Sequence, residues 1–199
     1  MRIERLVAAC ALMVALAPSA AFADGYVVPF VGVNFGGDVG TPLGVAIGDR
    51  SRATWGVGIG AMGGGVFGVE LDLGYTWKFF TDTNLVVTKN NVLTVMPALV
   101  LGVPVGGQRG VGVRPYVLAG AGLIRRDVGL ANLVSFSQND LGYTIGGGVM
   151  GFLGDHFGVR GEVRYFRNFQ GDELDIIGLN FETGTFNFGR ASAGAIFRF

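Results

Sequence analysis

The sequence predicts an all-β protein: an eight-stranded, antiparallel, up-and-down β-barrel that crosses a membrane. Half of the 199 residues are hydrophobic and only 15% are charged, whereas soluble domains usually carry roughly 25% charged residues. Beyond the N-terminal segment, no apolar run reaches the roughly 18 residues that a membrane helix needs. The chain instead contains segments of roughly ten residues in which apolar residues alternate with small or polar ones. If a membrane surrounds this protein, strands must cross it.

The N-terminal segment is typical of a cleaved export signal. A positively charged start is followed by an apolar stretch at residues 6–16 and by small residues at the cleavage position, Ala21-Phe22-Ala23. We therefore expect residues 1–23 to be a signal peptide and residues 24–199 to form the barrel domain. The single cysteine, Cys10, lies within this signal, so the mature protein is expected to lack disulfides and thiol chemistry.

The eight alternating segments divide the rest of the chain. They lie near residues 26–35, 53–62, 66–77, 92–103, 113–124, 140–151, 157–168 and 189–199. In the third segment every second residue from Phe67 to Trp77 is apolar, while Glu70 and Asp72 lie on the other face. A period of two is typical of a β-strand. About ten residues is the length that a tilted strand needs to cross a membrane.

Periodicity alone does not decide which face of these strands meets water. In a soluble sandwich the charged face is outside, whereas in a membrane barrel the apolar face meets lipid and the charges lie in the lumen. The export signal and the low charge favour the membrane barrel. Glycines on the polar face favour it too, because a solvent-facing strand normally carries Lys, Glu, Thr or Gln. These glycines are Gly56, Gly58, Gly60, Gly120, Gly122, Gly146 and Gly148.

Breaks between the segments alternate in length. The longer breaks are residues 36–52, 78–91, 125–139 and 169–188, and the shorter ones are residues 63–65, 104–112 and 152–156. Long loops outside and short turns at the periplasmic rim are the arrangement of outer-membrane barrels. Aromatic residues at the expected rims would form interfacial girdles. These are Tyr75, Trp77, Phe79 and Phe80 at the outer rim, with Phe197 and Phe199 at the inner one.

Charged residues on the expected inner face form a candidate lumen cluster. Its members are Glu70 and Asp72 on one strand and Arg160, Glu162 and Arg164 on another, and Arg114, Arg190 and Arg198 have the parity to join it. Buried charges need partners, because an unpaired one costs several kcal/mol. Since an eight-stranded lumen is just wide enough for side chains, a salt-bridge plug is favoured over a gate or selectivity lining.

Other chemistry finds little support in the residues. The 15 basic and 15 acidic residues balance and form no basic face for nucleic acid. Gly58-Ile59-Gly60-Ala61-Met62-Gly63 has a dinucleotide-binding spacing, but no βαβ unit accompanies it. His156, the only histidine, falls in an expected inner turn where no serine nucleophile can be placed beside it. We expect no catalytic residue, metal or cofactor.

The C-terminal residues resemble the β-signal by which outer-membrane barrels are recognised for assembly. Ser192, Gly194, Phe197 and Phe199 carry this pattern. Residues 114–122, 140–148 and 159–166 resemble the outer-membrane β-barrel family that includes opacity proteins and the OmpA-like transmembrane domain. The resemblance implies an eight-stranded barrel without enzymatic activity, associated with surface adhesion, envelope integrity or small-solute passage. No peptidoglycan-binding segment follows Phe199, so a wall-tethering role is not expected.

These expectations combine into one functional hypothesis. The protein is an integral outer-membrane barrel that anchors extracellular loops, for surface adhesion or envelope stabilisation. Its expected partners are outer-membrane lipid, the barrel-assembly machinery through the C-terminal strand, and an extracellular ligand at the loops. A narrow small-solute channel and a lipid-modifying enzyme using His156 are the alternatives. The oligomeric state is not predicted.

Overall fold

The computed structural model describes residues 23–36, 52–64, 66–77, 87–106, 110–130, 134–169, 175–176, 179–180 and 187–199. Its strands are β1 (Ala23–Phe35), β2 (Arg52–Gly63), β3 (Phe67–Trp77), β4 (Val87–Gly102), β5 (Val111–Leu130), β6 (Val134–Leu153), β7 (Phe157–Asn168), β8 (Asp175–Ile176), β9 (Leu179–Asn180) and β10 (Asn187–Arg198). The expected signal peptide lies outside the described residues except for Ala23, so its cleavage stays a prediction. Among the described residues, no helix has the length and hydropathy to cross a membrane.

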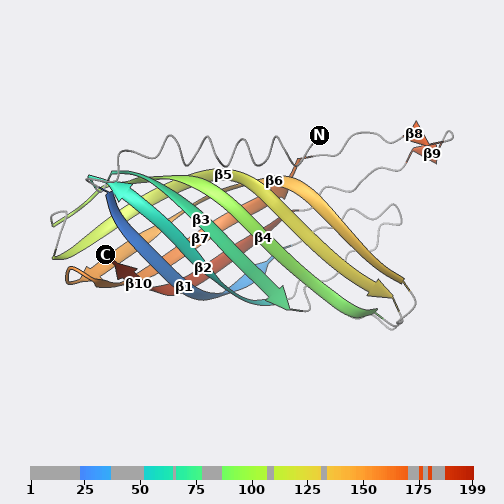
Figure 1. Cartoon of the computed structure of the whole chain (residues 1–199), viewed down its shortest axis with the longest axis horizontal. Helices are drawn as coiled ribbons and strands as arrows, with labels where there is room; N and C mark the ends of the chain where they lie inside the picture. The colour runs from blue at the N-terminus through green and yellow to red at the C-terminus, as the bar shows by residue number, and fades with distance from the viewer. Residues whose placement is uncertain are drawn as a thin grey trace.

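The eight long strands close into one barrel in the order β1-β10-β7-β6-β5-β4-β3-β2 (Figure 1). Every neighbouring pair is antiparallel. The predicted all-β, eight-stranded up-and-down barrel is therefore confirmed. The remaining two strands, β8 and β9, form a separate antiparallel pair.

The pairing register staggers the strands around the barrel. A path through paired residues that leaves β2 at Met62 crosses every wall strand and returns to β2 at Arg52, ten residues away. Such a stagger requires the strands to tilt, typically by about 35–45° to the barrel axis. For eight strands it encloses a lumen that side chains fill.

The two faces of the strands are those expected of a membrane barrel. Along β7 the residues from Phe157 to Phe166 alternate strictly between exposed and buried. Val163 is 55% exposed on the outside, whereas Arg160 is 6% and Glu70 3% exposed inside. Leu71 also faces outward, at 37% exposure. The barrel thus turns its apolar side chains outward and its charges inward.

Strands β4, β5 and β6 are longer than the sequence pattern predicted. Residues 87–91 and 125–139 were expected to be loops, but most of both stretches is strand. The prediction was wrong because it required one apolar face. Beyond the membrane a sheet has water on both sides, so a pair such as Arg125↔Asn139, in which both residues are exposed, can be polar. Only residues 131–133 separate β5 from β6.

The short connections and both described chain ends share one rim. Between β2 and β3, Gly64 has a φ of 57°, and Val66 N donates to Gly63 O at 3.3 Å. Gly110, with a φ of 80°, donates its N–H to Asp155 Oδ1 at 2.8 Å. Positive φ favours glycine because it has no Cβ. The Gly110–Asp155 contact therefore ties two adjacent turns together at this rim.

Aromatic pairs mark both ends of the apolar outer surface. The opposite rim, where β1 and β3 end and β2 begins, is called the long-loop rim after the longer breaks in the sequence. Toward it, the rings of Trp55 and Tyr75 lie 5.7 Å apart. Toward the short-turn rim, Phe157 and Phe197 lie 5.6 Å apart, and Phe199 is 78% exposed. The side chain of Trp77, and residues 79 and 80, lie outside the described part of the chain.

Candidate functional site: the charged lumen

Opposite walls of the barrel supply the charged side chains of the lumen. Glu70 and Asp72 project inward from β3, and Arg160, Glu162 and Arg164 project inward from β7. In the closed strand order β3 and β7 are four strands apart in either direction. Because inward positions recur every second residue, the parity of these five residues turns them all into the lumen. The stagger of the strands sets them at one height, where Arg190 from β10 joins them.

Ion pairs connect the two walls directly. Arg160 donates from Nη1 to Glu70 Oε2 at 2.6 Å and from Nη2 to Glu70 Oε1 at 2.9 Å. Arg164 pairs with both Glu70 and Glu162, and Arg160 also pairs with Glu162. Such two-pronged contacts between a guanidinium and a carboxylate are among the stronger hydrogen bonds in proteins. The central network therefore crosses the lumen.

Arg190 and Asp72 extend this network toward the long-loop rim. Arg190 Nη2 lies 2.6 Å from Asp72 Oδ2, and Arg164 Nη2 lies 3.6 Å from the same oxygen. The network then contains three arginines and three carboxylates, so its formal charges balance. Balance matters here because charges removed from water are stable only when they are paired.

Two tyrosines add hydrogen bonds to the carboxylates of Glu70 and Glu162. Tyr26 donates its hydroxyl to Glu70 Oε2 at 2.8 Å, and Tyr116 donates to Glu162 Oε2 at 2.7 Å. The guanidinium of Arg160 also lies 5.2 Å from the ring of Tyr116, within the range of a cation–π contact. Sequence reasoning missed both tyrosines, although their inward parity could have identified them.

Inward-facing glycines leave space for this network. A Cβ placed on Gly58 would lie 3.4 Å from the carboxyl group of Glu70, and one on Gly146 would lie 2.9 Å from Arg164 Cγ. A Cβ on Gly74 would meet Arg190 Nη1 at 2.5 Å. Large arginines therefore pack against strand positions that have no side chain, which is why glycines alternate along the inner wall.

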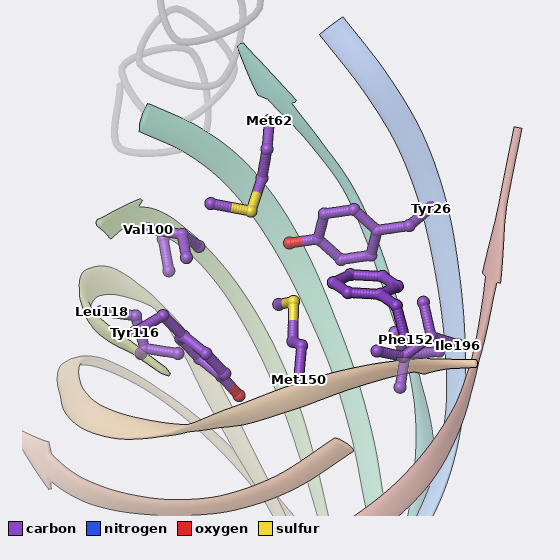
Figure 2. Close-up of a cluster of buried hydrophobic side chains, with 10 residues drawn as sticks. Tyr26, Met62, Val100, Tyr116, Leu118, Met150, Phe152 and Ile196 are labelled. Carbon is purple, nitrogen blue, oxygen red and sulfur yellow. The ribbon is translucent and has the colours of Figure 1, made fainter. Parts of the chain in front are cut away.

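Apolar clusters lie on both sides of the charged layer. The cluster toward the short-turn rim is shown in Figure 2 and consists of Tyr26, Val28, Met62, Ala98, Val100, Tyr116, Leu118, Met150, Phe152 and Ile196. The cluster toward the long-loop rim consists of Val92, Met96, Ile124, Phe166 and Phe188. In it Phe166 and Phe188 stack at 4.7 Å. The lumen thus contains apolar, ionic and apolar layers in succession.

A hydrogen-bonded chain of small polar side chains accompanies the second apolar cluster. Asn34 donates from Nδ2 to Thr76 Oγ1 at 2.7 Å, and Thr76 donates to Thr54 Oγ1 at 3.0 Å. All three residues are buried. Sequence reasoning did not single them out, because uncharged residues on the inner face give no signal of their own.

Comparison with protein families identifies the barrel. The model of the outer membrane protein beta-barrel domain matches residues 6–197. The chain belongs to this outer-membrane β-barrel family. It is therefore an outer-membrane protein, as its sequence predicted, and the apolar outer wall described above faces lipid. No curated protein sequence gives a significant match.

Solved outer-membrane barrels share this fold at low sequence identity. Neisserial surface protein A has a TM-score of 0.64 at 16% identity, over 88% of this chain and 97% of that one. Ail of Yersinia pestis, solved with the heparin analogue sucrose octasulfate, has a TM-score of 0.55 at 15% identity, over 88% and 99%. OprG of Pseudomonas aeruginosa has a TM-score of 0.51 at 17% identity, over 89% and 96%.

Two further arginines lie apart from the central network of this outer-membrane barrel. Arg114 and Arg198 are both buried at the short-turn rim, and their guanidinium carbons lie 5.1 and 4.5 Å from the ring centre of Phe152. Arg198 donates to the carbonyl of Asp155 at 2.6 Å. Arg114 Nη1 contacts Met62 Sδ at 3.4 Å. Shared parity therefore placed these two arginines in the lumen but not in the network.

The remaining sequence candidates of this outer-membrane protein lie at the rim and in the walls. His156 is exposed between β6 and β7, and its carbonyl accepts from Arg198 N at 2.8 Å. The glycine-rich motif at 58–63 lies within β2. Within the described residues, no group of three His, Cys, Asp or Glu side chains could hold a metal ion.

The four residues of the predicted C-terminal assembly signal lie on β10 and just after it. Ser192 and Gly194 are half-buried, whereas Phe197 and Phe199 are exposed outside. Strand β10 pairs with both β1 and β7, so it closes the barrel.

Proposed function

We propose that the protein is a non-enzymatic surface anchor, whose plugged barrel holds its long-loop rim at the cell surface for adhesion. The observation that carries this proposal is the Arg160–Glu70 ion pair, which joins opposite walls of the lumen. Apolar clusters of buried side chains fill the lumen on either side of this ion pair. A lumen filled in this way supports a rigid anchor better than a pore.

The β5–β6 hairpin supports an adhesive role. Pairing between β6 and β7 ends at Gly142↔Asn168, whereas pairing between β5 and β6 continues to Leu130↔Val134. The eight residues from 134 to 141 correspond to about 27 Å of strand. This hairpin therefore extends a stiff surface beyond the rim of the barrel, and loops held on a rigid scaffold commonly carry binding functions.

Adhesion can be tested on whole cells. Because Ail was solved with a heparin analogue, immobilised heparin is a suitable first probe. Cells that display the full chain should adhere to it, and cells whose residues 128–136 are replaced by an Asn-Gly turn should not. Heat-modifiable gel migration would establish that the shortened barrel still folds. Equal adhesion of both strains would contradict the proposal, and detergent sensitivity of a deletion strain would indicate envelope stabilisation instead.

A narrow channel is the second candidate function. Asp72 Oδ1, Arg164 Nη1 and Arg190 Nε are buried and have no hydrogen-bond partner among the described residues, and buried polar atoms of this kind commonly bind water. Planar bilayer recordings decide between the two candidates. The anchor predicts silent bilayers, whereas the channel predicts reproducible conductance that changes in Arg160→Gln.

The lipid-modifying enzyme is disfavoured by the position of His156. This histidine is exposed in a short turn, whereas an enzyme acting on lipid needs its base beside a nucleophile at the membrane face. Unchanged lipid profiles on overexpression of the wild type and of His156→Ala would support a non-enzymatic role.

We also assign Ser192, Gly194, Phe197 and Phe199 to recognition by the barrel-assembly machinery. Support comes from their place on the closing strand and from the exposure of Phe199, at 78%. Phe199→Ala should lower the yield of folded barrel in outer membranes. Phe157→Ala, at the same rim and 61% exposed, is the matched control.

A further inference from the structure

An apolar groove crosses the lipid-facing surface of the barrel. Its volume is about 540 Å³, and its outward lining includes Phe35, Val117, Ile145, Val163, Tyr165 and Gly189. These residues come from five adjacent strands, from β1 through β10, β7 and β6 to β5. Val117, Ile145 and Val163 are more than half exposed, so the groove opens to the lipid.

The groove arises because small residues separate large ones along two paired rows. One row, called the upper row because it is nearer the long-loop rim, contains Phe35, Gly189, Tyr165 and Ile145, which are neighbours in register. In the lower row Ala191, Val163, Gly147 and Val117 are paired in the same way. The ring of Phe35 lies over Gly189, within 2.3 Å of the place where a Cβ would be. Because Ala191 and Gly147 add little side-chain volume, the surface is lowest between their larger neighbours in the lower row.

A basic side chain lies directly beyond the upper row. Arg167 follows Tyr165 by two residues on β7, so it projects from the same outward face about 7 Å further along the strand. Arg167 is half-buried and is paired in register with Tyr143. Its guanidinium makes no ion pair or hydrogen bond with any residue that the structure describes.

We propose that this groove binds an acyl chain of a membrane lipid whose headgroup phosphate contacts Arg167. The apolar lining suits a hydrocarbon chain, and a guanidinium suits a phosphate because it can donate two parallel hydrogen bonds. Tyr143 and Tyr165 lie beside Arg167, as expected where hydrocarbon meets headgroups. Since Arg167 is near the long-loop rim, the lipid belongs to the outer leaflet. Phospholipids and phosphorylated glycolipids share this chemistry.

Native mass spectrometry of the full chain, folded in neutral detergent, tests the groove. Phosphatidylglycerol, lipid A and dioleoylglycerol serve as probes, and one of the two phosphorylated lipids should be retained at the lowest concentration. Val117→Trp fills the groove and should weaken retention about tenfold. Val159→Trp is the matched control, because Val159 is 57% and Val117 58% exposed but only Val117 lines the groove. If Val117→Trp does not fold, Gly147→Leu and Gly161→Leu form a second pair.

Arg167→Gln tests the phosphate contact separately. It should weaken retention of the phosphorylated lipid about tenfold, since a hydrogen bond to a charged group is lost, and leave dioleoylglycerol unchanged. Preference for phosphatidylglycerol or for lipid A identifies the source of the phosphate. Equal retention by Val117→Trp and Val159→Trp, or no effect of Arg167→Gln, overturns the proposal. A lipid-free dimer that Val117→Trp dissociates also overturns it, because a second copy then occupies the groove.

Discussion

Arg160 on β7 and Glu70 on β3 form a two-pronged ion pair between opposite walls of the barrel, at 2.6 and 2.9 Å. The pair is enclosed, since Arg160 is 6% and Glu70 3% exposed. It therefore acts as a cross-brace inside a closed sheet, and removing one partner leaves the other charged and buried.

Glu70→Gln should destabilise the barrel by about 3–5 kcal/mol, because Arg160 and Arg164 both lose a charged partner in the lumen. Urea unfolding in lipid vesicles, followed by tryptophan fluorescence, measures this change. Asp155→Asn is the control, since the Asp155 side chain is 62% exposed and lies 3.9 Å from Arg198. An equal loss of stability in both variants would contradict a bracing role for Glu70.

Gly146→Val should destabilise the barrel by about 1–3 kcal/mol through overpacking. Its Cβ would lie 2.9 Å from Arg164 Cγ and 2.6 Å from the backbone oxygen of Val163. Gly161→Val adds the same side chain to the outer wall, where a Cβ meets nothing within 4 Å. Unfolding curves of the two variants should differ clearly, and coincident curves would show that the lumen has room to spare.

Tyr26→Phe should lower the free energy of unfolding by about 1.5–3 kcal/mol, since a buried hydrogen bond to the charged Glu70 is lost. Tyr165→Phe, on the outer wall and 37% exposed, should change it little. In the double variant Tyr26→Phe/Glu70→Gln the two losses should not add, because both act on one contact. Additive losses measured by urea unfolding would show that the hydroxyl and the carboxylate act independently.

Most of the sequence prediction rested on residue parity, that is, on which face of a strand each residue occupies. Once Glu70 and Asp72 on one strand and Arg160, Glu162 and Arg164 on another were assigned inward, closure of eight strands brought them together. Parity did not give height along the barrel axis, which the stagger of ten residues sets. For this reason Arg190 and Arg114 looked equivalent in the sequence, although only Arg190 reaches the network.

The same limit explains the missed strand ends. Alternation records the change from lipid to lumen across a strand, and it disappears where water lies on both sides of the sheet. The polar stretch from Arg125 to Asn139 therefore read as a loop, although it forms most of the projecting β5–β6 hairpin.

Arg114→Met should change stability far less than Arg160→Met. In the described part of the chain Arg114 makes no ion pair, its Nε has no hydrogen-bond partner, and its contacts are Met62 Sδ and the ring of Phe152. Replacing such a buried cation with an apolar side chain of similar length is expected to be neutral or stabilising. Arg160→Met instead leaves Glu70 and Glu162 short of a partner and should cost about 3–5 kcal/mol.

Urea unfolding of both variants at low and high salt distinguishes the two positions. The Arg160→Met loss should persist in high salt, because the buried carboxylates are poorly screened. A similarly large loss in Arg114→Met would mean that Arg114 has an anionic partner at the short-turn rim. Charge there would then be balanced by Asp24, which interacts electrostatically with Arg114, or by a bound anion, and Arg114 would belong with the paired arginines of the lumen.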